Sequence, residues 1–127
     1  MLTGGAVMVS RVTIGGCRYY NDYNAFCNYV DMCLSRIRIS SKIVILSGHC
    51  SGTDTLAEKY ANENGFSLEV YPAQWKLYGR SAGPIRNEQM VNNCDFVIAF
   101  WDGKSKGTKS LIQCAREKQK PLRIKYI

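Results

Sequence analysis

The chain has 127 residues, of which 46% are hydrophobic and 11% aromatic, so it has the length of one domain and the apolar content of a packed core. This composition excludes a disordered chain, and no apolar run approaches the roughly 20 residues of a membrane-spanning helix. Seventeen Lys and Arg residues against ten Asp and Glu residues give a formal charge of +7, which favours anionic partners such as phosphates or nucleic acid.

Six cysteines are present, none in C-x-x-C spacing, and His49 is the only histidine. This set lacks the usual Cys/His pattern of a zinc site, so we expect no metal. Cysteines inside apolar runs are typical of a reducing compartment. The opening stretch has no basic n-region, so residues 1–10 are interpreted as an N-terminal leader, of which residues 1–7 are either native or derived from a tag or start site. A cytoplasmic location is therefore expected.

The elements alternate regularly along the chain. Short β-rich or apolar runs predict the five strands Arg11–Gly16, Lys42–Leu46, Ser67–Tyr71, Phe96–Phe100 and Leu122–Tyr126. Apolar residues at i, i+3 and i+4 spacing, with capping residues, predict helices over Asp22–Arg38, Thr53–Asn64, Pro84–Asn92 and Gly107–Lys118. The segment Pro72–Gly83 is predicted to be irregular.

This order predicts a parallel five-stranded sheet flanked by helices on both faces and joined by right-handed crossovers. Residues 11–127 are thus expected to form a single Rossmann-like, three-layer α/β domain. In such a sheet a ligand binds beyond the carboxyl ends of the strands, where three glycine-bearing loops are expected. The backbone N–H groups of these loops, with the helix N-termini behind them, suit phosphate oxygens. Their candidate ligand-binding residues are Gly15, Gly16, Arg18, Gly48, Ser51, Gly52, Thr53, Asp54, Asp102, Gly103, Lys104, Ser105, Gly107 and Thr108.

A fourth candidate segment carries Gly83, Arg86 and Asn87 at the start of a predicted helix. An arginine there opposes the helix dipole, a conflict that is relieved when the guanidinium binds an anion. The alternative is a solvated arginine paired with Glu88 or Asp95. The glycine loops, too, have an alternative role as simple turns.

Asp54 either accepts N–H bonds at the start of its helix or accepts a hydrogen bond from a ribose hydroxyl or amine of a ligand. Asp54 and Asp102 are the weak candidates for a catalytic acid or base. Trp75 and Trp101 are candidates for stacking on a base, with core or lid positions as the alternative. Neither complete phosphate-loop motif, G-x-G-x-x-G or G-x-x-x-x-G-K-[ST], is present in these loops.

Four stretches together resemble the YspA/YpsA-related branch of the SLOG superfamily over about residues 11–126. They are Gly15–Arg18, Ser47–Ala57, Ala82–Asn87 with Met90, and Ala99–Lys109. The resemblance implies a Rossmann-like domain that binds nucleotides or nucleotide-derived signals, with relatives that include DprA and the cytokinin-activating phosphoribohydrolases of the LOG group. On the matching positions the pocket would be lined by Gly48, Gly52, Asp54, Arg86, Asn87, Gly107 and Thr108.

One departure from the phosphoribohydrolases bears on activity. In those enzymes the stretch similar to Gly107-Thr108 continues with glutamates, whereas Lys109-Ser110-Leu111 follow here. We therefore expect binding of a small phosphorylated nucleotide-type ligand rather than hydrolysis. The alternatives are an N-glycosidic-bond hydrolase and a DprA-like binder of single-stranded nucleic acid. The resemblance also allows a homodimer.

Overall fold

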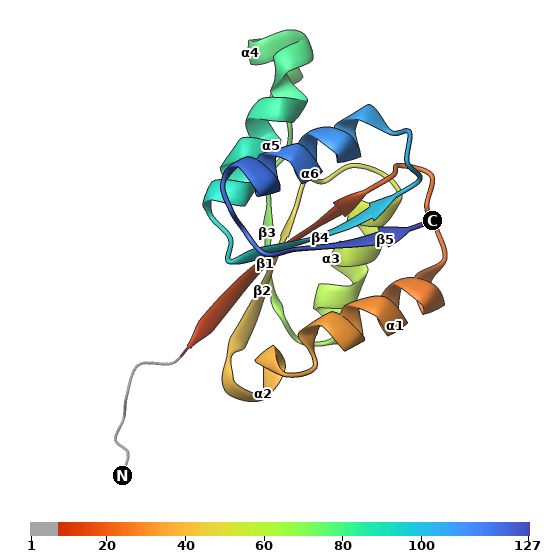
Figure 1. The fold of residues 1–127 in the computed structure, drawn as a ribbon, viewed down its shortest axis with the longest axis vertical. Helices are drawn as coiled ribbons and strands as arrows, with labels where there is room; N and C mark the ends of the chain where they lie inside the picture. The colour runs from red at the N-terminus through yellow and green to blue at the C-terminus, as the bar shows by residue number, and fades with distance from the viewer. Residues whose placement is uncertain (1–7) are drawn as a thin grey trace.

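Residues 8–127, the part of the chain that the computed structural model describes, form a five-stranded sheet with helices on both faces (Figure 1). All neighbouring strands are parallel. The elements are β1 (Val9–Gly16), α1 (Tyr23–Leu34), α2 (Ile37–Ser40), β2 (Lys42–Ser47), α3 (Thr53–Glu63), β3 (Ser67–Val70), α4 (Trp75–Tyr78), the 3-10 turn η1 (Gly79–Ser81), α5 (Ala82–Asn92), β4 (Phe96–Trp101), α6 (Lys106–Glu117) and β5 (Leu122–Tyr126). The predicted three-layer α/β fold is confirmed.

The strand order β3-β2-β1-β4-β5 creates a switch point in the middle of the sheet. The chain moves outward from β1 to β3, then crosses back to β4 and continues to β5. The first connections place α1 and α3 on one face of the sheet, and the later ones place α5 and α6 on the other (Figure 1). Loops after β1 and β4 therefore diverge at the carboxyl edge of the sheet, where open α/β sheets bind ligands.

Each face of the sheet has its own hydrophobic core. Val12 and Ile14 of β1 pack with Phe26 of α1 and Tyr60 of α3, and all four side chains are buried. On the opposite face Leu46 and Val97 pack with residues of α5 and α6. The strands are thus buried on both sides, which explains why their sequences read as continuous apolar runs rather than as alternating ones.

The helix predicted over Asp22–Arg38 is shorter and is followed by a second turn. Asp22 is its N-cap and accepts a hydrogen bond from Ala25 N at 3.0 Å. The helix ends after Leu34, where the Ser35 hydroxyl donates to Met32 O at 3.0 Å and so competes for a helix carbonyl. A separate short helix, α2, follows, and Ile37 packs against the core below the sheet.

The segment Pro72–Gly83 was predicted to be irregular, but part of it is helical. It contains α4 and η1, and α5 begins at Ala82, before Pro84. Pro84 lies in the first turn of α5, where its missing N–H costs no helix hydrogen bond. At the other end, β1 begins at Val9, inside the expected leader of residues 1–10, whereas residues 1–7 lie outside the described residues.

Candidate functional site

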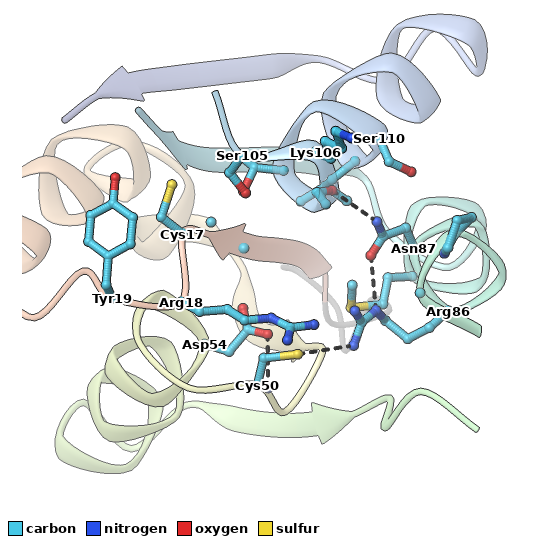
Figure 2. A pocket seen from close by; sticks show the side chains of 18 of the residues that line it. Cys17, Arg18, Tyr19, Cys50, Asp54, Arg86, Asn87, Ser105, Lys106 and Ser110 are labelled. Carbon is cyan, nitrogen blue, oxygen red and sulfur yellow. Dashed lines mark hydrogen bonds between the residues drawn. The ribbon is translucent and has the colours of Figure 1, made fainter. Parts of the chain in front are cut away.

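A cavity of about 450 Å³ opens at the carboxyl edge of the sheet, beside the switch point between β1 and β4. Five segments meet around it: the end of β1 with its following turn, the loop before α3 with the start of that helix, the segment of α4 and η1, the start of α5 and the start of α6 (Figure 2). We call it the carboxyl-edge cavity. It is lined by Gly15, Gly16, Cys17, Arg18, Tyr19, Cys50, Asp54, Trp75, Arg80, Gly83, Pro84, Arg86, Asn87, Met90, Ser105, Lys106, Gly107, Thr108, Ser110 and Leu111.

The charge of this wall is strongly positive. Arg18, Arg80, Arg86 and Lys106 line the cavity, and among the described lining residues Asp54 is the one carboxylate. Three of the four cations are exposed at the rim, whereas Arg86 is buried. Such a concave, positively charged surface attracts small anions.

Two helix N-termini also face the cavity. Neither the N-cap of α5, Ser81, nor that of α6, Ser105, uses its side chain to cap its helix. Gly83 lines the cavity from the first turn of α5, and Lys106, Gly107 and Thr108 do so from that of α6. The first N–H groups of a helix have no intrahelical acceptor, and the helix dipole places partial positive charge there. The start of α6 can therefore present backbone donors to an anion.

Arg86 belongs to α5, its side chain reaches the loop after β2, and only 8% of it is exposed. Its Nη1 donates to Gly48 O at 2.6 Å, and its Nε donates to Asn87 Oδ1 at 2.9 Å. Within the described residues, Nη2 has no hydrogen-bond acceptor. Arg86 does not pair with Glu88 or Asp95; the Asp95 carboxylate accepts from Arg11 N instead. The guanidinium thus holds the Gly48 carbonyl and the Asn87 side chain with two of its nitrogen atoms and leaves the third without a partner among the described residues.

Asp54 is 7% exposed, and its Oδ2 accepts from Cys50 N at 3.1 Å. It therefore holds the loop in front of α3. Burial raises the pKa of this carboxyl to about 6, and the Cys50 N–H and the Arg86 charge offset part of that rise. Near neutral pH the group is a buried carboxylate on the wall of a cationic cavity.

The loop between β2 and α3 supports the site more than it lines it. A Cβ on Gly48 would lie 2.5 Å from Arg86 Nη1, so a glycine is needed for the guanidinium to reach this backbone. Gly52 adopts φ +71° and packs against the Arg18 carbonyl. Thr53 Oγ1 donates to Cys17 O at 2.9 Å, and Ser51 is exposed. Gly48, Ser51, Gly52 and Thr53, which we predicted as ligand contacts, do not line the cavity.

The turn after β4 is held by Asp102. Its Oδ1 accepts from Lys104 N and Ser105 N, both at 2.8 Å, and its Oδ2 accepts from Tyr19 OH at 2.6 Å. These hydrogen bonds, that of Tyr19 first, hold the pKa of Asp102 well below its usual range. Asp102, Gly103 and Lys104 lie off the cavity wall, so this carboxylate holds the turn after β4 rather than lining the cavity.

The two tryptophans occupy different environments. Trp75 of α4 is 50% exposed and lines the cavity, where its Cη2 lies close to the open side of Gly83. Trp101 donates its Nε1–H to Ser105 O at 3.1 Å and packs against Tyr126, with ring centroids 6.0 Å apart. Trp101 is not on the cavity wall, so of the two predicted stacking residues only Trp75 faces the cavity.

Of the predicted ligand contacts, Gly15, Gly16, Arg18, Asp54, Gly83, Arg86, Asn87, Ser105, Gly107 and Thr108 line the cavity. The wall residues that sequence reasoning did not propose as contacts are Cys17, Tyr19, Cys50, Arg80, Pro84, Met90, Lys106, Ser110 and Leu111. Helical spacing carried a usable signal for several of them. Met90 lies four residues after Arg86, and Ser110 and Leu111 lie three and four residues after Gly107, on the same helix faces.

The sequence comparisons decide the family. A family model described as "YspA, cpYpsA-related SLOG family" matches residues 10–78, more than half of the chain. The chain belongs to this family. The Gene 61 protein of Mycobacterium phage D29 is 33% identical to it over 116 residues, covering 87% of this chain and 89% of that protein. The resemblance seen in the sequence is thereby confirmed.

Solved structures agree on the fold of this SLOG family member. DprA, a DNA processing protein from Streptococcus pneumoniae, superposes with a TM-score of 0.69 at 18% identity over 91% of this chain and 50% of that one. DprA from Helicobacter pylori, described by its single-stranded DNA binding mode, gives 0.62 at 21% identity over 91% and 64%. TM1055 gives 0.62 at 18% identity over 89% and 72%. The SLOG chain thus spans half to about two thirds of the DprA chains.

No helix among residues 8–127 is long and apolar enough to cross a membrane. Over the same residues, no group of three or more His, Cys, Asp or Glu side chains is placed to hold a metal ion.

Proposed function

We propose that the carboxyl-edge cavity binds a nucleotide or nucleotide-derived ligand through its phosphate groups, and that the protein acts as a sensor or signalling module. The observation that carries the proposal is the convergence of the open α6 N-terminus and four cationic side chains on one cavity. Its volume, about 450 Å³, lies within the usual range for small-molecule sites.

The wall has different chemistry at its two ends, which suggests an orientation for the ligand. Phosphate oxygens suit the N–H groups of Gly107 and Thr108, with Lys106 and Arg18 beside them. Met90 and Leu111 supply an apolar floor, and the half-exposed Trp75 offers a ring face for a base. Asp54 would accept from a ligand hydroxyl or amine.

Lys106 gives the sharpest test of this proposal. Arg86→Ala would also remove the hydrogen bond that holds Gly48, so its effect would mix binding with stability. Lys106 is exposed at the rim, and Lys106→Gln should weaken binding by about 1–2 kcal/mol through loss of one charged contact. A ligand is first found by thermal shift against AMP, ADP, ADP-ribose and cyclic dinucleotides, since ligand binding raises apparent stability. Calorimetry then gives the affinities.

Lys109→Gln is the matched control, because Lys109 lies on the same helix, carries the same charge, is exposed and does not line the cavity. Its affinity should stay close to that of the wild type. Equal losses in the two variants would mean that overall charge and not the cavity governs binding. No thermal shift with any nucleotide of the panel would overturn the proposal.

A second candidate function is hydrolysis of a nucleotide N-glycosidic bond. It is favoured by one observation: a buried carboxyl, Asp54, lies on the cavity wall with a pKa of about 6, near that of a general acid working at neutral pH. Release of free base from nucleoside monophosphates, abolished by Asp54→Asn, would support this function. The cytoplasmic location and the homodimer stay predictions.

A further inference from the structure

Cys50 places a thiol on the cavity wall beside a cation. Its Sγ lies 3.8 Å from Arg86 Nη1 and 3.9 Å from Gly48 O (Figure 2). The backbone on both sides of it is fixed, because Cys50 N donates to Asp54 Oδ2 at 3.1 Å and Cys50 O accepts from Thr55 Oγ1 at 3.2 Å. The thiol is half-buried, so a small molecule inside the cavity can reach it.

Most of the other cysteines lie in a different setting. Burial raises the pKa values of the Cys27, Cys33, Cys94 and Cys114 thiols, which disfavours the reactive thiolate. These four do not line the carboxyl-edge cavity. Cys17 lines it but is only 1% exposed. Cys50 therefore combines access through the cavity with contact to a positive charge.

The surroundings of Cys50 point independently to an anionic molecule. Arg86 is more than nine-tenths buried, and its Nε and Nη1 bond to the protein. Its Nη2 has no acceptor among the described residues; since no buried side-chain nitrogen or oxygen atom there lacks a partner, Nη2 remains open to solvent. Figure 2 shows the Arg18 guanidinium on the same side of the cavity as Asp54 and Cys50. A carboxylate or phosphate drawn to these groups would be held within reach of the sulfur.

We propose that Cys50 is a modification site that forms a reversible mixed disulfide with a small disulfide carrying carboxylate groups. The adduct fills the carboxyl-edge cavity and excludes the phosphorylated ligand, so the modification acts as a redox control of binding. This second part rests on the proposed nucleotide function, whereas formation of the adduct does not.

The chemistry is thiol–disulfide exchange. Cys50 loses its proton to water, and the thiolate attacks one sulfur of the small disulfide. A new S–S bond forms to Cys50 as the original S–S bond breaks, and the departing half leaves as a thiolate that takes up a proton. Cys50 is oxidised and the departing sulfur is reduced, so no further oxidant is needed, and an added thiol reverses the step.

The test exposes the native full chain to glutathione disulfide and follows intact mass, with peptide mapping to locate the adduct. We expect one glutathionyl group, on Cys50, removed again by a thiol reductant. Cys50→Ser should abolish the fast adduct, while Cys114→Ser, which alters a half-buried cysteine outside the cavity, should leave it unchanged. An adduct located on another cysteine, or an internal disulfide in its place, would overturn the proposal without recourse to any variant.

Cystamine, a cationic small disulfide, tests the role of charge. The rate with glutathione disulfide relative to that with cystamine should be several-fold higher for the native chain than for the denatured chain, since only the native cavity gathers positive charge around Cys50. An equal ratio in the two states would overturn recognition by charge.

Nucleotide and glutathione disulfide should also exclude each other. If a nucleotide binds by calorimetry but Cys50 forms no adduct, the inference fails alone; if the adduct forms and no nucleotide binds, the proposed function fails alone.

Discussion

At the scale of a single residue, Asp54 links the loop before α3 to helix α5. Its carboxylate holds Cys50 N, and its charge lies near the Arg86 guanidinium, which in turn holds Gly48 O. The loop before α3 is thereby tied to α5 through two buried charged groups. Such a pair is costly to bury, and the raised pKa of Asp54 measures the part of that cost that Arg86 and the Cys50 N–H do not offset.

The first prediction at this scale concerns stability against pH. The ordinary Asp pKa of 3.8 applies in the unfolded chain, whereas the folded value is about 6, so the folded state binds the proton more tightly. The stabilisation is complete below about pH 4 and is lost as pH rises through 6. Relative to that of the wild type, the free energy of unfolding of Asp54→Asn should therefore rise by on the order of 2 kcal/mol from pH 4 to pH 7. Urea unfolding at a series of pH values measures this.

Asp22→Asn is the control, because it removes one negative charge from an exposed carboxylate while asparagine keeps the N-cap of α1. Its stability difference from the wild type should vary far less over the same pH range. Parallel pH curves for the wild type and Asp54→Asn would show that Asp54 ionises as it does in the unfolded chain.

At the scale of elements, the sequence predicted each of the five strands to within two residues, because buried parallel strands give continuous apolar runs bounded by glycine or polar turns. The helices were placed by their 3.6-residue period. The break between α1 and α2 was missed because apolar residues continue in phase through Ile37, and only the local hydrogen bonds of Ser35 end the helix. Helix α4 was missed because four residues are too few to show a period.

Within the site, the sequence located residues whose position follows from the order of the elements and missed side-chain directions that depend on local contacts. Residues at strand ends and helix starts were found, since topology alone brings these to one edge. Asp102 and Trp101 were predicted on the wall from their position in the chain, but both side chains contact the protein instead. Asp102 accepts hydrogen bonds from Tyr19 OH and Ser105 N, and Trp101 donates to Ser105 O and packs against Tyr126. Sequence position does not reveal which way such a side chain points. Arg80 came from a segment with no predicted structure.

Helix α4 carries the prediction at this scale. It stands away from the body of the domain (Figure 1), and it presents Trp75 to the cavity with half of the residue exposed. Trp75→Ala should weaken binding of a nucleotide by about 1–3 kcal/mol through loss of stacking, with little effect on unfolding. Leu77→Ala is the control, because Leu77 lies on the same short helix, is 67% exposed and does not line the cavity.

Tryptophan fluorescence gives a second readout of the same prediction. The chain has two tryptophans, and only Trp75 lines the cavity. Nucleotide binding should quench emission in Trp101→Phe but leave Trp75→Phe almost unchanged. Quenching retained in Trp75→Phe would come from Trp101 and would place the base near Ser105, whose carbonyl accepts the Trp101 Nε1–H.

At the scale of the whole molecule, the sheet order explains why distant segments form one site. The turn after β1, the loop after β2 and the start of α6 lie far apart in sequence, yet β2, β1 and β4 are neighbours in the sheet. The return crossover from β3 adds the start of α5. The family match covers residues 10–78, so α5 and α6 complete the cavity from outside that match.

The net charge of +7 raises the question of a nucleic-acid partner. A single strand that neutralised about four cations would lose about fiftyfold in affinity between roughly 50 and 200 mM salt, through release of counterions. We predict this steep loss for an oligonucleotide, measured by fluorescence anisotropy, and a much smaller loss for a mononucleotide.

A strand held by overall charge does not enter the cavity. Lys106→Gln and Lys109→Gln should therefore weaken oligonucleotide binding equally, and excess mononucleotide should not displace the oligonucleotide. Oligonucleotide binding that survives 200 mM salt, is displaced by mononucleotide and depends on Lys106 alone would instead make the carboxyl-edge cavity a single-strand site.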